Sequence, residues 1–149
     1  MAEQSSNEHA KQVGSDATPL DPTDAHGRLR IGHFEFAALT AAAADTLNLL
    51  KMPAGKIRIL RLTLVTSAFA ATADLDIGHS AYTDRSDRSA EVADVDAFAA
   101  ALDVATGGTF EVLVDKTIDS SGGWTLTGTL ANAGGSAETI KGFVEYILD

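Results

Sequence analysis

The chain has 149 residues, 45% of them hydrophobic, with no cysteine and a formal net charge of −10. A chain of this length is the size of one domain with one buried core. The lack of cysteine excludes disulfides, thiolate metal sites and cysteine nucleophiles. The acidic charge opposes general binding to a nucleic-acid backbone, so we expect no nucleic-acid partner.

Residues 1–27 differ in composition from the rest of the chain. They are polar and acidic, with Pro19 and Pro22 near their end, and they hold too few apolar residues to offset the entropy cost of ordering. We therefore expect a flexible acidic N-terminal arm over residues 1–27 and a β-sandwich domain over residues 28–149. The arm lacks the apolar core of a secretory signal. No stretch of the chain approaches the roughly 20 apolar residues that span a bilayer, so no membrane partner is expected.

Alternating side chains predict strands from Leu29 onward. The apolar residues of the first strand change phase, which predicts a bulge or a twist near Gly32 or His33. A second strand is expected over residues 46–51, followed by a turn at residues 53–55.

The longest apolar strand covers residues 56–67, and its phase also slips. Ile57 and Ile59 lie on one face, whereas Leu60 and the leucines after it lie on the other. Either a bulge redirects the strand or both of its faces are buried. Both interpretations place this strand in the core.

The second half of the chain mixes plain and irregular patterns. Residues 73–79 predict a half-exposed strand, and the polar residues 82–93 predict a protruding loop. Residues 94–105 favour a short helix, because apolar side chains recur at three- and four-residue spacing, at Val95, Phe98, Ala99 and Leu102. Three late strands follow, separated by glycine- and serine-rich turns.

Seven or eight short strands with one short helix predict an all-β fold, an antiparallel β-sandwich of the jelly-roll type. Periodicity alone does not separate a jelly roll from an immunoglobulin-like sandwich. The chain has no cysteine pair, and Trp124 comes late, so the spacing of antibody domains is absent.

No arrangement of side chains predicts catalysis, a cofactor or a metal. His33 and His79 lie on apolar strand faces and could meet across the sheet, but two unrelated histidines, packed or at the rim, are the simpler interpretation. Asp74 and Asp76 recur as in a calcium loop, yet the third acid and the final glutamate are missing, so a solvated strand face is expected. Phosphate-binding loops and nucleophile motifs are also absent. We therefore expect no enzyme.

Aromatic side chains offer one further alternative, a platform for a sugar. Trp124, Tyr82 and Tyr146 could form it, but Trp124 alternates in phase with leucines, and core packing accounts for it better. A carbohydrate-binding module therefore remains an alternative function.

Four short segments follow one another along the chain, around a strand rich in Leu, Ile and Val. They are Leu-Leu-Lys-Met-Pro-Ala-Gly at 49–55, Leu-Asp-Ile-Gly at 75–78, Asp-Val-Asp-Ala-Phe at 94–98 and Lys-Gly-Phe-Val-Glu-Tyr-Ile at 141–147. In this order they resemble small virion structural proteins of tailed bacteriophages, namely head decoration or cement proteins. The likeness covers about residues 34–149.

The resemblance implies a jelly-roll-like fold without catalysis. It further implies that the chain is made in the host cytoplasm and binds the major capsid protein on the outer capsid surface, often as a homotrimer, and stabilises the shell. A phage tail or baseplate protein is the alternative of the same type.

Candidate partner-binding side chains are basic, because they can pair with acids on the shell or at a trimer seam. They are Arg58, Arg61, Arg85 and Arg88. We expect the contact face to include the loop 82–93. The arm 1–27 either crosses to a neighbouring subunit or capsomer or is a disordered tail without a role.

Overall fold

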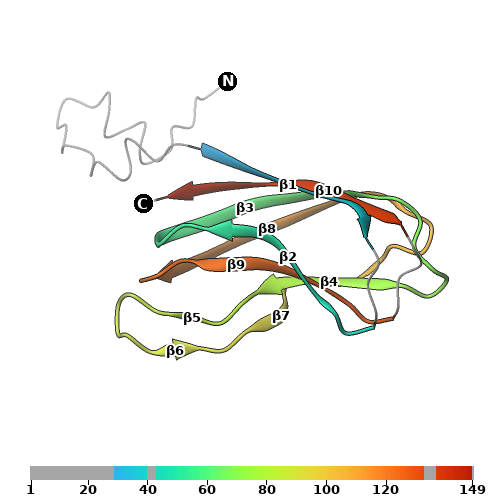
Figure 1. Ribbon diagram of the computed structural model, residues 1–149. Helices are drawn as coiled ribbons and strands as arrows, with labels where there is room; N and C mark the ends of the chain where they lie inside the picture. Colours follow the sequence, from blue (N-terminus) through green and yellow to red (C-terminus); the bar gives the residue numbers. More distant parts are fainter. Residues whose placement is uncertain (1–28, 40–42, 133–136, 149) are drawn as a thin grey trace, which may run out of the picture.

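The computed structural model describes residues 29–39, 43–132 and 137–148, which form two stacked β-sheets and a short hairpin (Figure 1). Sheet A contains, in spatial order, β1 (Leu29–Leu39), β10 (Glu138–Leu148), β3 (Gly55–Thr66) and β8 (Gly108–Ser120). Sheet B contains β2 (Thr46–Met52), β9 (Trp124–Leu130), β4 (Asp74–His79) and β7 (Asp94–Asp103). The hairpin consists of β5 (Tyr82–Thr83) and β6 (Ala90–Glu91).

The strand pairing is that of a jelly roll. Each strand of the first half pairs antiparallel with its counterpart in the second half: β1 with β10, β2 with β9, β3 with β8 and β4 with β7. The chain is thus one long antiparallel ribbon wrapped into two sheets, closed by the β10–β3 and β4–β9 pairs. This confirms the predicted antiparallel sandwich.

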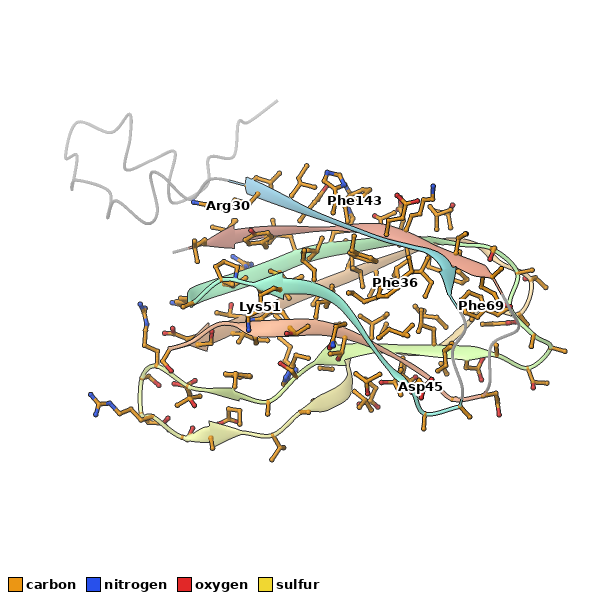
Figure 2. All side chains as sticks on the ribbon, viewed as in Figure 1. Arg30, Phe36, Asp45, Lys51, Phe69 and Phe143 are labelled. Carbon is orange, nitrogen blue, oxygen red and sulfur yellow. The ribbon has the colours of Figure 1, made fainter. Side chains whose placement is uncertain are left out.

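The core lies between the two sheets. Alternate side chains of each strand point inward, and the largest fully buried ones come from both sheets, among them Trp124, Met52, Ile57 and Leu75. Burying one such side chain contributes about 1.5–3 kcal/mol. Figure 2 shows Phe36 pointing into this space, while Phe143 lies on the opposite side of sheet A.

A bulge in β3 explains its change of phase. The register shifts against β8 between Ile59 and Arg61, and against β10 between Glu145 and Tyr146. The extra residue at this point allows Ile59 and the later Leu62 to face the same core, at 1% exposure each. The first of the two interpretations, a bulge that redirects the strand, is confirmed.

The bulge predicted in β1 near Gly32 or His33 is wrong. From Leu29 to Phe36 the strand pairs residue by residue with β10, and its register shifts only beyond Phe36. The apparent change of phase arises because Leu29 and Ile31 are apolar but point outward, with 55% and 52% of their surface exposed.

The short helix predicted over residues 94–105 is also wrong, because Asp94–Asp103 is strand β7. Its ten residues pair with the six of β4 through two register shifts, and the extra residues interrupt the alternation. At one irregular position Ala101 has a φ of 50°, and its N–H donates to Asp76 Oδ1 at 2.7 Å. These bulges produce the three- and four-residue spacing that mimics a helix.

The remaining strands follow the predictions closely. The second, fourth and three late strands lie where their alternation placed them, and the segment 82–93 contains the β5–β6 hairpin. No helix in the described part of the chain is long and apolar enough to cross a membrane. The predicted arm, residues 1–27, lies outside the described residues.

The close approach of β7 to β4 yields a test of the fold. A Cβ atom at Gly78 would overlap the backbone of Asp94 and Val95, whereas a Cβ atom at Gly122 would meet nothing. We expect Gly78→Ala to lower the free energy of unfolding by about 1–3 kcal/mol, because the strands must separate. Gly122→Ala should change it by less than about 0.5 kcal/mol. Urea unfolding of both variants measures this, and equal effects would contradict the strand packing.

Candidate interaction surface

The outward-facing side chains of sheet A form a regular array. Four cross-strand rows run over β1, β10, β3 and β8. We call these residues the outer face; its rows are Glu35, Lys141, Val65 and Thr109; His33, Phe143, Thr63 and Glu111; Ile31, Glu145, Arg61 and Leu113; and Leu29, Ile147, Arg58 and Thr117. Asp115 lies beside the last two rows, on β8.

Apolar side chains are concentrated on this face. Six large hydrophobic residues are exposed in the described part of the chain, and four of them belong to the outer face: Leu29, Ile31, Val65 and Leu113. Leu113 is the most exposed of the six, at 85%. Half-buried Phe143 and Ile147 lie between them on β10. An apolar surface of this kind marks a site of interaction with another molecule.

Three ion pairs join most of the charged side chains of the outer face and the adjacent Asp115. Arg61 donates to both carboxylate oxygens of Glu145, at 2.7 and 3.2 Å. Arg58 Nε lies 2.8 Å from Asp115 Oδ1, and Lys141 Nζ lies 2.9 Å from Glu35 Oε1.

These pairs change the pKa values of their partners. The hydrogen bond and charge of Glu145 raise the pKa of Arg61, and the hydrogen bond and charge of Arg58 lower the pKa of Asp115. The Arg58–Asp115 and Glu35–Lys141 pairs are solvent-exposed and add little stability, whereas the Arg61–Glu145 pair is partly buried. Their main effect is to leave the outer face with almost no net charge, although the whole chain carries −10.

A hollow of about 430 Å³ opens on the outer face. It lies between the His33–Phe143 ring pair, whose centroids are 5.9 Å apart, and the Glu35–Lys141 ion pair. Val65 and Thr63 line it as well, and the buried hydroxyl of Thr63 has no hydrogen-bond partner.

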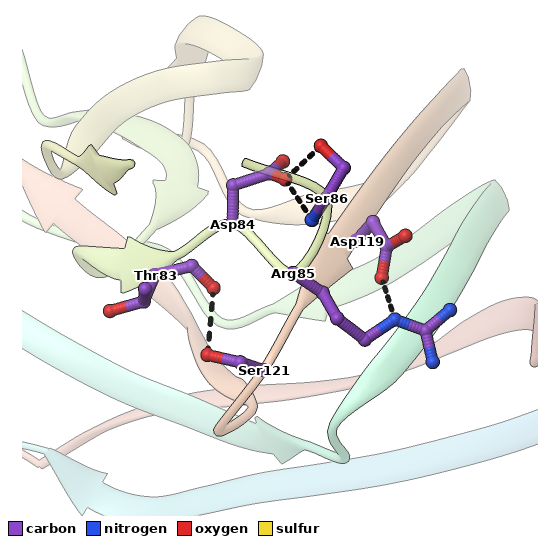
Figure 3. Close-up of polar contacts among 6 residues, drawn as sticks. All are labelled: Thr83, Asp84, Arg85, Ser86, Asp119 and Ser121. Atoms are coloured by element: carbon purple, nitrogen blue, oxygen red, sulfur yellow. Dashed lines mark hydrogen bonds and ion pairs between the residues drawn. The ribbon is translucent and has the colours of Figure 1, made fainter. Parts of the chain in front are cut away.

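The β5–β6 hairpin is fixed to the end of β8, as Figure 3 shows. Arg85 Nε lies 2.9 Å from Asp119 Oδ1, and the Arg85 N–H donates to the Asp119 carbonyl at 3.0 Å. The Ser121 N–H and hydroxyl both donate to the Thr83 carbonyl. Hydrogen bonds from Ser86 lower the pKa of Asp84. The predicted loop is therefore an anchored hairpin.

The four arginines predicted to bind a partner do not form one basic patch. Arg58 and Arg61 lie on the outer face, Arg85 ties the hairpin to β8, and Arg88 is exposed in the hairpin. Three of them pair with acids of this chain, which leaves their role toward a partner a prediction.

Sequence reasoning missed the exposed apolar side chains. The signal was present, because β1 and β8 carry apolar residues on both faces, for example Leu113 between Val112 and Val114.

The two histidines lie apart. His33 is exposed on sheet A, whereas His79 is buried in sheet B, with its ring centroid 5.3 Å from that of Tyr82 and 6.1 Å from that of Trp124. Two unrelated histidines, as the simpler interpretation holds, are what the structure shows. Asp76 bonds the β7 backbone, and the described residues hold no group of three or more potential metal ligands.

The sugar platform is not formed. Trp124 is 1% exposed and packs in the core. Tyr82 is half-buried in the β5–β6 hairpin, and Tyr146 is half-buried on β10 of sheet A. The interpretation of Trp124 as a core residue is confirmed.

No protein-family model matches the sequence, and no curated protein matches it. Solved structures do share the fold. A chain of the cyanophage Pam1 capsid asymmetric unit matches with a TM-score of 0.61 and 19% identity, over 83% of this chain and 86% of that chain. A chain of the acid-stable capsid of Helicobacter pylori bacteriophage KHP30 matches with a TM-score of 0.50 and 16% identity, over 80% and 87%. At these identities the likeness shows a common fold, and in both cases it extends over most of each chain.

The Arg58–Asp115 pair predicts a titration. Because the pKa of Asp115 is below its ordinary value of 3.8, the contribution of the pair to stability is present above that value and is lost as the pH falls through the lowered pKa. We expect Arg58→Gln to raise the pKa of Asp115 toward 3.8, measured by NMR of the side-chain carboxyl carbon. Arg85→Gln is the control and should leave it unchanged. An ordinary pKa for Asp115 in the unaltered protein would contradict the pair.

Proposed function

We propose that the chain is a structural protein of a phage virion, which binds the outer surface of an icosahedral capsid and stabilises it. The observation that carries the proposal is the jelly roll shared, over more than four fifths of both chains, with a chain of the Pam1 capsid. The apolar outer face supports it, because such a surface suits a protein that works by contact.

The proposal includes no catalytic role. The side chains singled out for chemistry are engaged in structure: His79 packs against aromatic rings, and Asp76 holds the bulged backbone of β7. A jelly roll by itself is compatible with many functions, so the argument rests on the surface and on the capsid chains that share the fold.

The major capsid protein is the proposed partner, and a homotrimer is the proposed assembly. Linked copies multiply a weak contact through avidity. Copies that bind only the mature shell stabilise it by mass action, by about 2.7 kcal/mol per site at a free concentration one hundred times the Kd. The acidic charge outside the outer face keeps crowded copies soluble.

The basic residues and the arm have supporting roles in this proposal. Arg58 and Arg61 lie within the outer face, where each can leave its carboxylate partner in this chain and pair with a carboxylate of the shell protein. Arg85 and Arg88 lie in the β5–β6 hairpin and can pair with acids there. The arm, residues 1–27, is proposed to cross to a neighbouring subunit, because its composition disfavours independent folding.

Co-sedimentation tests the proposal. The purified chain is mixed with DNA-free heads of the phage that encodes it, and bound copies per head are counted by mass. We expect saturable binding at hundreds of copies per head, in multiples of three, and a higher temperature of head disruption. Absence of binding, or a few copies on the virion tail, would overturn the proposal. A tail count would favour the tail or baseplate alternative, and selective binding on a glycan array the carbohydrate-binding one.

Deletion of residues 2–27 tests the arm. We expect the shortened chain to keep the thermal unfolding of the β-sandwich domain but to occupy fewer sites on the head and to protect it less from heat, because an ordered contact with the neighbour is lost. Unchanged occupancy and heat resistance would contradict a role for the arm.

A further inference from the structure

We infer that the outer face of sheet A is the surface that binds the capsid, and that the shell protein meets it with an apolar surface of low net charge. This inference rests on the proposed function and deepens it by naming the contact surface and the chemistry of the partner.

The distribution of exposed apolar side chains is the first argument. Ile31 and Leu113 lie at the two ends of one cross-strand row, and Leu29 lies next to Ile31 on the same face of β1. The exposed apolar residues therefore extend from β1 to β8, the two edge strands of sheet A, rather than clustering at one edge. The described residues of the chain leave each of them largely exposed, so burial against a partner is available as a driving force.

Sheet B provides the contrast. The strands β2, β9 and β4 carry none of the exposed large hydrophobic residues of the described chain, and β7 carries one, Val95. Their outward positions include Thr125, Thr129, Asp74 and Asp76 instead. The two broad faces of the sandwich thus differ in chemistry, and only that of sheet A suits the removal of a large area from water.

Charge is the second argument, and it defines the partner. Arg61, Arg58 and Lys141 already have carboxylate partners on the same face. Because these charges are paired before binding, the partner need not supply counter-charges, and burial leaves fewer ions unpaired. The rest of the chain is strongly acidic and repels an acidic surface. The matching surface is therefore apolar with little net charge.

The hollow adds a specific feature. Its volume of about 430 Å³ admits a protruding side chain of the shell protein, whose apolar body would pack against Phe143 and Val65. The Glu35–Lys141 pair at its side can accept or donate hydrogen bonds. Anchors seated in such recesses contribute most to protein binding.

A second copy of this chain is the competing occupant. If a second copy covered the outer face, the other broad face left for the capsid would be that of sheet B, with its hydroxyl and carboxylate side chains. Face-to-face pairing would also bring two chains of net charge −10 together over their widest surfaces. Both points favour the shell protein.

Aspartate substitutions at exposed apolar positions test the inference. Leu113→Asp and Ile31→Asp place a charge on the outer face, and Val95→Asp, at a residue of β7 in sheet B that is 46% exposed, is the matched control. Binding to DNA-free heads, thermal unfolding and sedimentation velocity of the free protein are measured for each variant. We expect Leu113→Asp and Ile31→Asp to raise the Kd at least about tenfold, as for central contact residues. Val95→Asp should change it less than about twofold, and unfolding and free oligomeric state should stay the same throughout.

The outcomes separate the two proposals. If the unaltered chain does not bind heads, the proposed function fails. If it binds and both outer-face variants bind equally well, the inference alone fails. A change in the free oligomeric state with Leu113→Asp would assign the face to a second copy and overturn the inference. Loss of binding only in the double variant Arg85→Glu, Arg88→Glu would overturn it in favour of the hairpin.

Discussion

The apolar inner faces of the two sheets must pack against each other without water between them. The bulges and register shifts of the strands follow from that constraint. The bulge at Leu60 keeps both halves of β3 facing the core. Two register shifts in β7 fit ten residues against the six of β4, and Asp76 bonds the N–H of Ala101 at an irregular position. Gly78 leaves the space that this close approach requires. A sandwich held in this way leaves its outer faces free to differ.

Where polar and apolar residues alternate regularly, the sequence predicted the strands correctly. Where bulges interrupt that alternation, it did not. The strands β4, β9 and β10 lie where polar and apolar residues alternate. In β7 the alternation is interrupted by bulges, whose cause is pairing with a distant strand, so a window of sequence resembles a helix. In β1 we assumed that apolar residues point inward. Leu29 and Ile31 are apolar but exposed, and this produced the incorrect prediction of a bulge.

The outer face was predictable only in part, because its ion pairs and its exposure depend on which distant strands pair with each other. The basic residues Arg58 and Arg61 were visible in the sequence, but their partners lie 57 and 84 residues away and follow from strand register. The apolar positions of the outer face had a signal, namely apolar residues on both faces of one strand, which burial on both sides would also produce. Only the structure separates these cases, because within the described part of the chain Leu113 is left 85% exposed.

The two outer faces, the anchored hairpin and the shared fold give one account of the molecule. The sandwich is a body with two unlike faces: that of sheet A carries apolar side chains among mostly paired charges, and that of sheet B carries acids and hydroxyls. Such a body suits repeated attachment to a large shell, since many equal contacts act together. A cryo-EM reconstruction of phage heads saturated with the chain tests this most directly. The account predicts jelly-roll density on the head with sheet A toward the shell, and density with sheet B or the hairpin toward the shell would contradict it.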